Sequence, residues 1–232
     1  MSARIVVLAK TPVPGRVKTR LCPPCTPEQA ARIAAAALGD TLAAVTATPA
    51  AARILAVDGD LPAPPGWERV IQRGGPLGER LAFAYADTAP PRSATLLIGM
   101  DTPQAGPALL AEASARLTAG DADAVFGPAT DGGWWALGLR DPTHASVLRD
   151  IPTSTGETGA LTRAALEALG LRVATLPQLT DVDTAPDALA VAALCPPGSR
   201  FRAAVAAELA AMPAEGAGVP ATPSGATVEA AA

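Results

Sequence analysis

Residues 4–21, RIVVLAKTPVPGRVKTRL, decide the fold. The first six form a short apolar run rich in β-branched residues, which is typical of a buried parallel strand. A loop rich in proline, glycine and cations follows. Thr26-Pro-Glu-Gln29 then supplies an N-cap, a proline in the first turn and a capping-box glutamine. We therefore expect a strand, a basic loop and a helix that runs to about Thr48.

The same alternation continues along the chain. Expected strands lie at residues 53–57, 70–71, 95–99, 124–126, 134–139 and 172–176, and expected helices at 77–87, 107–118, 157–169 and 186–193. This pattern predicts an α/β fold of three layers with a mostly parallel central sheet. The 232 residues suffice for one such domain, which we expect over residues 1–212. Residues 213–232 are mostly Ala, Gly, Pro, Ser and Thr, and we expect a disordered tail.

Composition argues against several classes of protein. The net charge of −4 disfavours a nucleic-acid binder, because competing for the phosphate backbone requires a basic face. No apolar run approaches the roughly 20 residues that span a bilayer, and the N-terminus lacks the pattern of a signal peptide. We therefore expect a cytoplasmic protein with neither a nucleic acid nor a membrane as partner.

Cys22-Pro-Pro-Cys25 has the spacing of a zinc or redox pair. A zinc site would need a second pair of ligands, and the chain offers only Cys195 and His144, each isolated in sequence. We therefore interpret the two cysteines as thiols beside a proline turn.

The loop after the first strand concentrates positive charge in an acidic chain. Lys10, Arg16, Lys18 and Arg20 fall within eleven residues, and Gly15 lets the backbone approach a ligand. Ligands of open parallel sheets bind beyond the carboxyl ends of the strands, where this loop lies. We therefore expect the loop to bind nucleotide phosphates and to neutralise a triphosphate and its pyrophosphate leaving group. The alternative is a solvated loop without a ligand.

Two acidic segments predict a site for Mg²⁺ or Mn²⁺. Asp101 follows an apolar strand in Gly99-Met-Asp-Thr-Pro103, and hard cations of this kind prefer oxygen ligands. Asp181 and Asp183 point the same way if the segment is extended, which offers a second oxygen ligand for the same metal. Helix N-caps are the competing explanation, by Asp101 before one helix and by Asp183 or Thr184 before another.

A glycine-rich turn separates two of the expected strands in residues 127–139, GPATDGGWWALGL. Asp131, Gly132 and Gly133 suffice for a hairpin turn. Trp134 and Trp135 stand out in a chain with only 3% aromatic residues, so they also suggest one wall of a pocket for a sugar or an acceptor. Both interpretations are compatible, because alternation along a strand sends the two rings to opposite faces.

Four ordered segments now resemble a known family: residues 9–21, AKTPVPGRVKTRL; 99–103, GMDTP; 127–133, GPATDGG; and 181–184, DVDT. The set is similar to the largely uncharacterised transferases of the A-type glycosyltransferase superfamily, which are often classed as glycosyltransferases, some linked to arsenosugar biosynthesis. The resemblance covers about residues 4–194, and Gln72 with Gly78-Glu-Arg80 fits a further family segment.

The resemblance implies a three-layer, Rossmann-like A-type glycosyltransferase fold. It implies Asp101 and Asp183 as metal ligands, with Arg16, Lys18 and Arg20 at the phosphates. Further nucleotide-binding positions are then Lys10, Gly15, Gln72, Gly78, Asp131 and Gly132. The chain departs from its relatives at Thr153-Ser-Thr155, where they tend to carry a tryptophan before Ser-Thr. The departure concerns the acceptor side of the site.

The basic loop favours one reaction over another. Related nucleotidyltransferases, acting on sugar phosphates, molybdopterin and phospholactate, carry such a loop, and its cations stabilise a departing pyrophosphate. We therefore expect metal-dependent nucleotidyl transfer from an NTP to a small phosphate-like acceptor, with Arg16, Lys18 and Asp101 as catalytic residues. An ionised acceptor needs no general base, which fits the lack of a plausible catalytic histidine. The alternatives are glycosyl transfer from a nucleoside diphosphate sugar and a nucleotide-binding module without catalysis.

Overall fold

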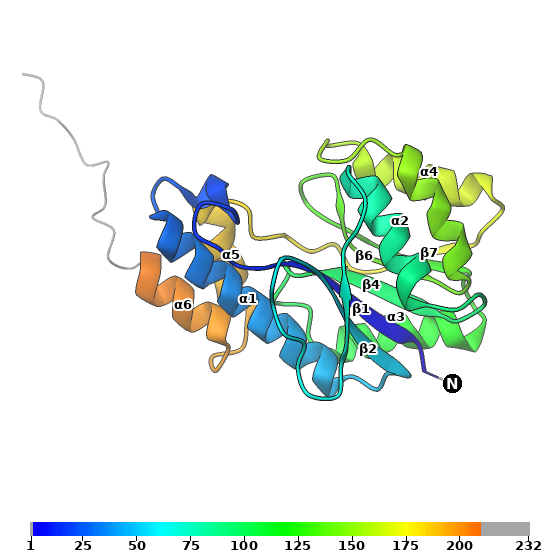
Figure 1. Cartoon of the computed structure of the whole chain (residues 1–232), viewed down its shortest axis with the longest axis horizontal. Helices are drawn as coiled ribbons and strands as arrows, with labels where there is room; N and C mark the ends of the chain where they lie inside the picture. Colours follow the sequence, from blue (N-terminus) through cyan, green and yellow to red (C-terminus); the bar gives the residue numbers. More distant parts are fainter. Residues whose placement is uncertain (1, 210–232) are drawn as a thin grey trace, which may run out of the picture.

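Seven strands form one central sheet in the computed structural model, which describes residues 2–209 (Figure 1). The strands are β1 (Arg4–Lys10), β2 (Ala52–Asp58), β3 (Glu68–Ile71), β4 (Thr95–Gly99), β5 (Ala124–Pro128), β6 (Trp134–Leu139) and β7 (Val173–Thr175). Their order is β3-β2-β1-β4-β6-β5-β7, and only β6 runs antiparallel to its neighbours within the described residues. The predicted mostly parallel α/β fold is therefore confirmed, while the expected tail at 213–232 lies outside the described residues.

Successive side chains along a strand point to opposite faces of the sheet, and the strands carry apolar side chains on both faces. Helices therefore cover both faces. Ile5 and Val7 pack under α1 (Pro27–Ala47) and α3 (Pro107–Ala119). Val6 packs under α2 (Leu77–Thr88), α4 (Thr158–Ala168) and a 3₁₀ segment, η2 (Pro142–Asp150). A third cluster joins α1 to α5 (Ala185–Leu194) and α6 (Arg200–Leu209), which lie on the far side of α1 in Figure 1.

Helix α1 begins as its sequence predicts. Thr26 caps it through a reciprocal capping box with Gln29. The helix is apolar on two sides, because Ala34 and Leu38 face the sheet while Ile33 faces α5 and α6. By length and composition alone α1 could span a membrane, which corrects the expectation that no apolar run is long enough; half of its apolar window is buried inside the protein.

Three elements were not expected from the sequence: the 3₁₀ turn η1 (Thr19–Leu21) in the basic loop, the segment η2 and helix α6. The segment η2 is a nine-residue 3₁₀ helix whose buried residues, Pro142, Ala145 and Leu148, recur every three residues and therefore do not give the 3.6-residue period of an α-helix. Helix α6 places Phe201, Val205 and Leu209 four residues apart, and all three are buried against α1 and α5. That spacing is a readable helical signal, and the interpretation of the sequence missed it.

The topology creates a crevice at the centre of the sheet. The chain moves from β1 to β2 on one side, and β4 lies against β1 on the other. The loops that follow β1 and β4 therefore leave the sheet at a topological switch point, where ligands of open α/β sheets bind. A hydrogen bond from the Lys10 amide to the Met100 sulfur, at 3.2 Å, links the two loops directly.

Candidate functional site

A cavity of about 250 Å³ opens where the loops after β1 and β4 meet. We call it the basic cavity. Its charged lining residues are Lys10, Arg16, Lys18, Arg20, Asp101 and Asp183. The four cations predicted to bind phosphate thus surround one space, together with both predicted metal ligands. Gly15, with φ of 73°, turns the loop in the left-handed region but does not line the cavity.

Lys18 lies between the two carboxylates of this cavity. Its Nζ is 2.9 Å from Asp101 Oδ1 and 3.1 Å from Asp183 Oδ1, and only 9% of its side chain is exposed. Burial lowers the pKa of Lys18, but the two carboxylates more than offset this and raise the pKa above its ordinary value. Arg20 Nη1 contacts Asp183 Oδ2 at 2.8 Å.

The backbone of the basic loop explains how Lys18 reaches both acids. Lys18 adopts the left-handed conformation, with φ of 48°, and precedes the 3₁₀ turn η1 (Thr19–Leu21). Leu21 is fully buried among the side chains of α1, α5 and α6 and fixes the end of the turn. The turn therefore holds the lysine over the ends of β1 and β4.

The extended segment 179–183 carries Asp181 and Asp183 to the same edge of the sheet. It pairs with the β5–β6 hairpin, and the Leu179 amide donates a hydrogen bond to the Pro128 carbonyl at 3.1 Å. Its Val182 amide donates to the Asp101 carbonyl at 3.0 Å, and the Val182 side chain is buried. Asp181 and Asp183 flank this residue and reach into one cluster, as the alternation in an extended segment predicts.

Helix capping does not account for the two predicted metal ligands. Thr184 is the N-cap of α5 and forms a capping box with Asp187, so Asp183 is not needed there. Gly106 is the N-cap of α3, five residues beyond Asp101. Their carboxylates are instead held in the basic cavity by Lys18 and Arg20.

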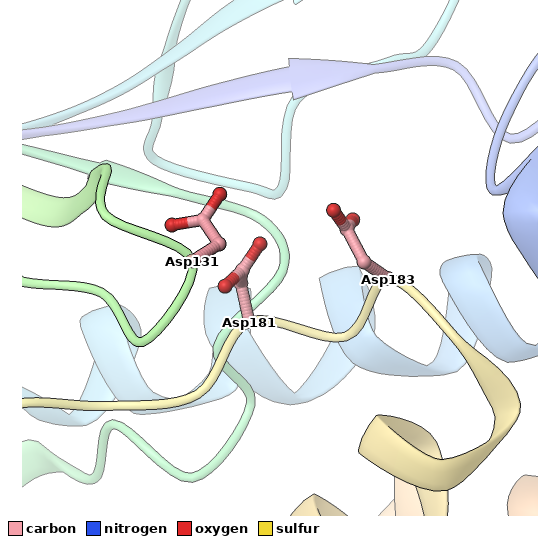
Figure 2. Close-up of side chains that lie close together, drawn as sticks. All are labelled: Asp131, Asp181 and Asp183. Atoms are coloured by element: carbon pink, nitrogen blue, oxygen red, sulfur yellow. The ribbon is translucent and has the colours of Figure 1, made fainter. Parts of the chain in front are cut away.

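Three carboxylates converge from two loops (Figure 2). Asp131, Asp181 and Asp183 each offer an oxygen, and these oxygens lie within 4.8 Å of one another. The Gly133 amide donates to Asp131 Oδ1 at 2.8 Å, which fixes that side chain in its turn. Burial, and then the negative charges of Asp131 and Asp183, raise the pKa of Asp181 to about 6. A set of three carboxylate oxygens fits a hard divalent cation.

Asp101 and Asp183 are therefore not arranged as the pair of metal ligands that we expected. Asp183 belongs to the three-carboxylate cluster, whereas Asp101 is bridged to Asp183 by Lys18. Asp131, predicted as a nucleotide contact, lies in the cluster beside Asp181. Neither the metal role of Asp101 nor the nucleotide role of Asp131 is tested by this geometry, and both stay predictions.

A second cavity, of about 300 Å³, adjoins the basic cavity and shares Met100 and Asp101 with it. We call it the Trp134 cavity. Trp134 lines it from the α2 side of the sheet. The Trp135 ring packs in the α1 layer, where its Nε1 donates to the Pro177 carbonyl at 3.0 Å. The two rings thus lie on opposite faces, as expected, and the Trp pair does form part of a cavity wall.

Besides Gly15, three predicted nucleotide-binding residues line neither cavity, and each of the three has a structural role. Gln72 donates through Nε2 to the backbone carbonyls of Ala9, at 2.7 Å, and Ala56, at 2.9 Å. A Cβ at Gly78 would collide with the Leu148 carbonyl, so glycine permits α2 to pack on η2. Gly132, with φ of 88°, likewise has no room for a side chain against the loop of residues 153–159. Contact of these residues with nucleotide stays a prediction.

The cysteines form no disulfide within residues 2–209. Cys25 is buried in the cluster between α1, α5 and α6, and Cys22 packs against it. Burial raises the pKa of the Cys25 thiol, with smaller contributions from Cys22 and Glu208. This placement agrees with thiols that serve packing.

The sequence interpretation missed several residues of the Trp134 cavity. The cavity includes a wall of four leucines and the hydroxyl residue Thr158, which come from strands and helices read only as core. The leucines are Leu8, Leu77, Leu81 and Leu97. Core and cavity-wall positions share the same apolar pattern in a sequence, so only the fold distinguishes them.

Comparisons with solved structures place the fold among nucleotide-using enzymes. The chain matches a protein assigned as a nucleotide-diphospho-sugar transferase from Desulfovibrio desulfuricans, with 27% identity, a TM-score of 0.79, and coverage of 90% of this chain and 96% of that one. It matches Rv0371c from Mycobacterium tuberculosis with 23% identity, a TM-score of 0.54 and coverage of 82% and 98%; that protein was also solved with manganese. It matches CMP:2-keto-3-deoxy-manno-octonic acid synthetase bound to CTP with 12% identity, a TM-score of 0.51 and coverage of 82% and 96%.

These structural neighbours with a named activity are nucleotidyl or sugar transferases. No curated protein sequence matches the chain. A family described as "Uncharacterized protein conserved in bacteria (DUF2064)" matches residues 30–155, which include Asp101 and Asp131 but neither the basic loop nor Asp181 and Asp183. Because this match covers more than half of the 232 residues, the chain belongs to the DUF2064 family.

Proposed function

We propose that the protein is a nucleotidyltransferase that binds the phosphates of an NTP in the basic cavity and releases pyrophosphate. The observation that carries this proposal is the convergence of Lys10, Arg16, Lys18 and Arg20 on one cavity at the switch point of the sheet. Lys18 and Arg20 pair with Asp101 and Asp183, whereas Lys10 and Arg16 form no ion pair within residues 2–209, so the cavity keeps positive charge that an anionic ligand can meet. A triphosphate is an anion of suitable charge.

The proposed reaction transfers the nucleotide from an NTP in the basic cavity to an acceptor in the adjoining Trp134 cavity. An ionised oxygen of the acceptor forms a bond to the α-phosphorus, and the bond from that phosphorus to the bridging oxygen of the β-phosphate breaks. The electron pair leaves with pyrophosphate, beside the guanidinium groups of Arg16 and Arg20. These exposed cations gain most as the leaving group becomes more negative, so they stabilise the transition state more than the bound substrate.

Asp131, Asp181 and Asp183 are the residues that would hold a divalent cation, with Asp101 at the wall that the two cavities share. A bound Mg²⁺ or Mn²⁺ would supply charge neutralisation at the phosphates. The fold neighbour solved with manganese supports this choice of ion. Lys18 pairs with Asp101 and Asp183 and fixes the orientation of their carboxylates toward the cavity.

Pyrophosphate release tests the proposal. Purified protein with Mn²⁺ is screened against the four common NTPs and a panel of small phosphorylated acceptors. Arg16→Ala is expected to abolish release, because it removes an exposed cation of the basic cavity. Arg116→Ala is the matched control, since Arg116 pairs with Glu112 on the surface of α3 and should leave release unchanged. Unchanged release in Arg16→Ala, or nucleotide binding without any product, would overturn the proposal.

Glycosyl transfer from a nucleoside diphosphate sugar is a second candidate. The observation that favours it is the Trp134 cavity, which adjoins the basic cavity and offers an aromatic wall to a sugar ring. A diphosphate in the basic cavity would then place its sugar in the Trp134 cavity. The same screen with sugar nucleotides distinguishes the two, because this reaction releases a nucleoside diphosphate and no pyrophosphate.

A further inference from the structure

The four cations of the basic cavity divide into two kinds. Lys10 and Arg16 form no ion pair in the described part of the chain, so their charge is not compensated by a carboxylate. Lys18 and Arg20 are paired with carboxylates that line the same cavity. A polyphosphate chain that enters the cavity therefore meets two free cations and two that are already bound to other anions.

Asp183 is the carboxylate that both paired cations share. Its Oδ1 lies 3.1 Å from Lys18 Nζ and its Oδ2 lies 2.8 Å from Arg20 Nη1, so each oxygen of Asp183 contacts a cation. Asp183 also belongs to the three-carboxylate cluster with Asp131 and Asp181 (Figure 2). The same carboxylate thus takes part in the ion pairs of the basic cavity and in the candidate site for a divalent cation.

These two uses of Asp183 compete. A divalent cation on the cluster would lie beside the Lys18 ammonium and the Arg20 guanidinium, and like charges at such short range repel each other. Only 9% of the Lys18 side chain is exposed, so water and salt screen this repulsion poorly. Phosphate oxygens offer both side chains another partner, because they accept charge-assisted hydrogen bonds as carboxylate oxygens do.

We infer that a bound polyphosphate chain takes Lys18 and Arg20 away from Asp183 and thereby frees this carboxylate for the divalent cation. The exchange replaces carboxylate contacts with phosphate contacts, so the two side chains keep anionic partners. The phosphates and the cation then strengthen each other's binding, and this coupling is reciprocal. Without phosphates, the same ion pairs hinder binding of the cation. The inference rests on the proposed function, because it assigns the order in which the same site is filled.

The metal-free protein provides the first test. Metal is removed on a chelating resin, and inorganic tripolyphosphate is titrated into the protein in a calorimeter. Asp183→Asn removes the anion that competes for Lys18 and Arg20. It should therefore tighten tripolyphosphate binding about tenfold or more, which is the effect of about one charge-assisted contact.

Asp181→Asn is the matched control. It removes a carboxylate from the same cluster, but Asp181 forms no ion pair with a lysine or an arginine among residues 2–209. The titrations are made near pH 8, where Asp181 is ionised because its pKa is about 6. The control should change the affinity for tripolyphosphate by less than about threefold, since it removes only a general repulsion.

Two further measurements make the test independent of one variant. With saturating Mn²⁺, Asp183→Asn should weaken tripolyphosphate binding, because Asp183 then serves the cation. Asp101→Asn removes the other partner of Lys18, which lies 2.9 Å away, and should also tighten metal-free binding. Thermal unfolding of each variant ensures that every titration is made on folded protein.

The exchange would be overturned if Asp183→Asn left the metal-free affinity unchanged, or raised it no more than Asp181→Asn does. Lys18 and Arg20 would then bind phosphates without leaving Asp183. Tighter binding in Asp183→Asn both with and without Mn²⁺ would also contradict it, because Asp183 would then only repel the phosphates. Failure of the proposed function gives a different pattern: tripolyphosphate binding responds to Asp183 as expected, but no NTP yields pyrophosphate. Tripolyphosphate that binds neither the unmodified protein nor any variant would overturn both.

Discussion

Replacing Lys18 by methionine should make the apo protein bind Mn²⁺ more tightly. In the structure the Lys18 ammonium contacts Asp101 at 2.9 Å and Asp183 at 3.1 Å, so a cation that uses either carboxylate must compete with it. Each buried charge-assisted contact contributes about 1.5–3 kcal/mol. Asp183 is the one of these two carboxylates that belongs to the three-carboxylate cluster, so the competition is worth about 1.5–3 kcal/mol, which is roughly tenfold to a hundredfold in the dissociation constant for Mn²⁺.

Mn²⁺ is titrated into the protein without nucleotide, and electron paramagnetic resonance measures the concentration of free Mn²⁺ at each step. Lys10→Met is the matched control, because Lys10 lines the same cavity and forms no ion pair within residues 2–209. Thermal unfolding gives an independent readout. Lys18→Met removes the ion-pair partner of Asp101 and leaves Asp183 paired only with Arg20, so its Tm should fall without metal and recover with Mn²⁺ more than that of the unmodified protein. Equal Mn²⁺ affinity in Lys18→Met and the unmodified protein would refute the reasoning.

Three further predictions concern stability. The pKa of Asp181 is raised to about 6, so ionising Asp181 lowers the free energy of unfolding above about pH 6 and has no effect below its ordinary pKa of 3.8. In urea titrations of the metal-free protein, Asp181→Asn should therefore raise the free energy of unfolding by up to about 3 kcal/mol near pH 8 and leave it unchanged near pH 3.5. Hydrogen bonds from Arg172 lower the pKa of Asp123 to about 2, so the ionised carboxylate stabilises the folded protein above pH 3.8, and this stabilisation is lost as the pH falls toward 2. Asp123→Asn should lower the free energy of unfolding by about 1 kcal/mol at neutral pH. If the variant were still less stable than the unmodified protein by that amount near pH 2, this cause would be contradicted. Gly78→Ala should cost about 1–3 kcal/mol in urea unfolding because its methyl group collides with the Leu148 carbonyl, while Gly198→Ala, with open space around it, serves as control.

Local sequence patterns predicted much of the fold. The β-branched run of β1 and the capping box of α1 predicted their elements because both features act within a few residues. The antiparallel placement of β6 between β4 and β5 depends instead on contacts between distant strands, and the sequence pattern contained only the hairpin turn.

The site was predictable in part for the same reason. The cations of the basic loop fall beyond a strand end, so their shared cavity with Asp101 follows from sheet topology. The three-carboxylate cluster requires the segment 179–183 to run beside the β5–β6 hairpin, and nothing near Asp131 in the sequence indicates that neighbour. The bridging position of Lys18 depends on a left-handed backbone at a residue that is not glycine, which sequence patterns rarely reveal.

A crystal structure with Mn²⁺ and an NTP analogue that resists cleavage between the α- and β-phosphates tests the central claim most directly. The account predicts the phosphates in the basic cavity, in contact with Arg16 and Arg20, and the ion on Asp183 with its neighbouring carboxylates. Phosphates bound away from these cations, with the basic cavity filled only by solvent, would contradict it.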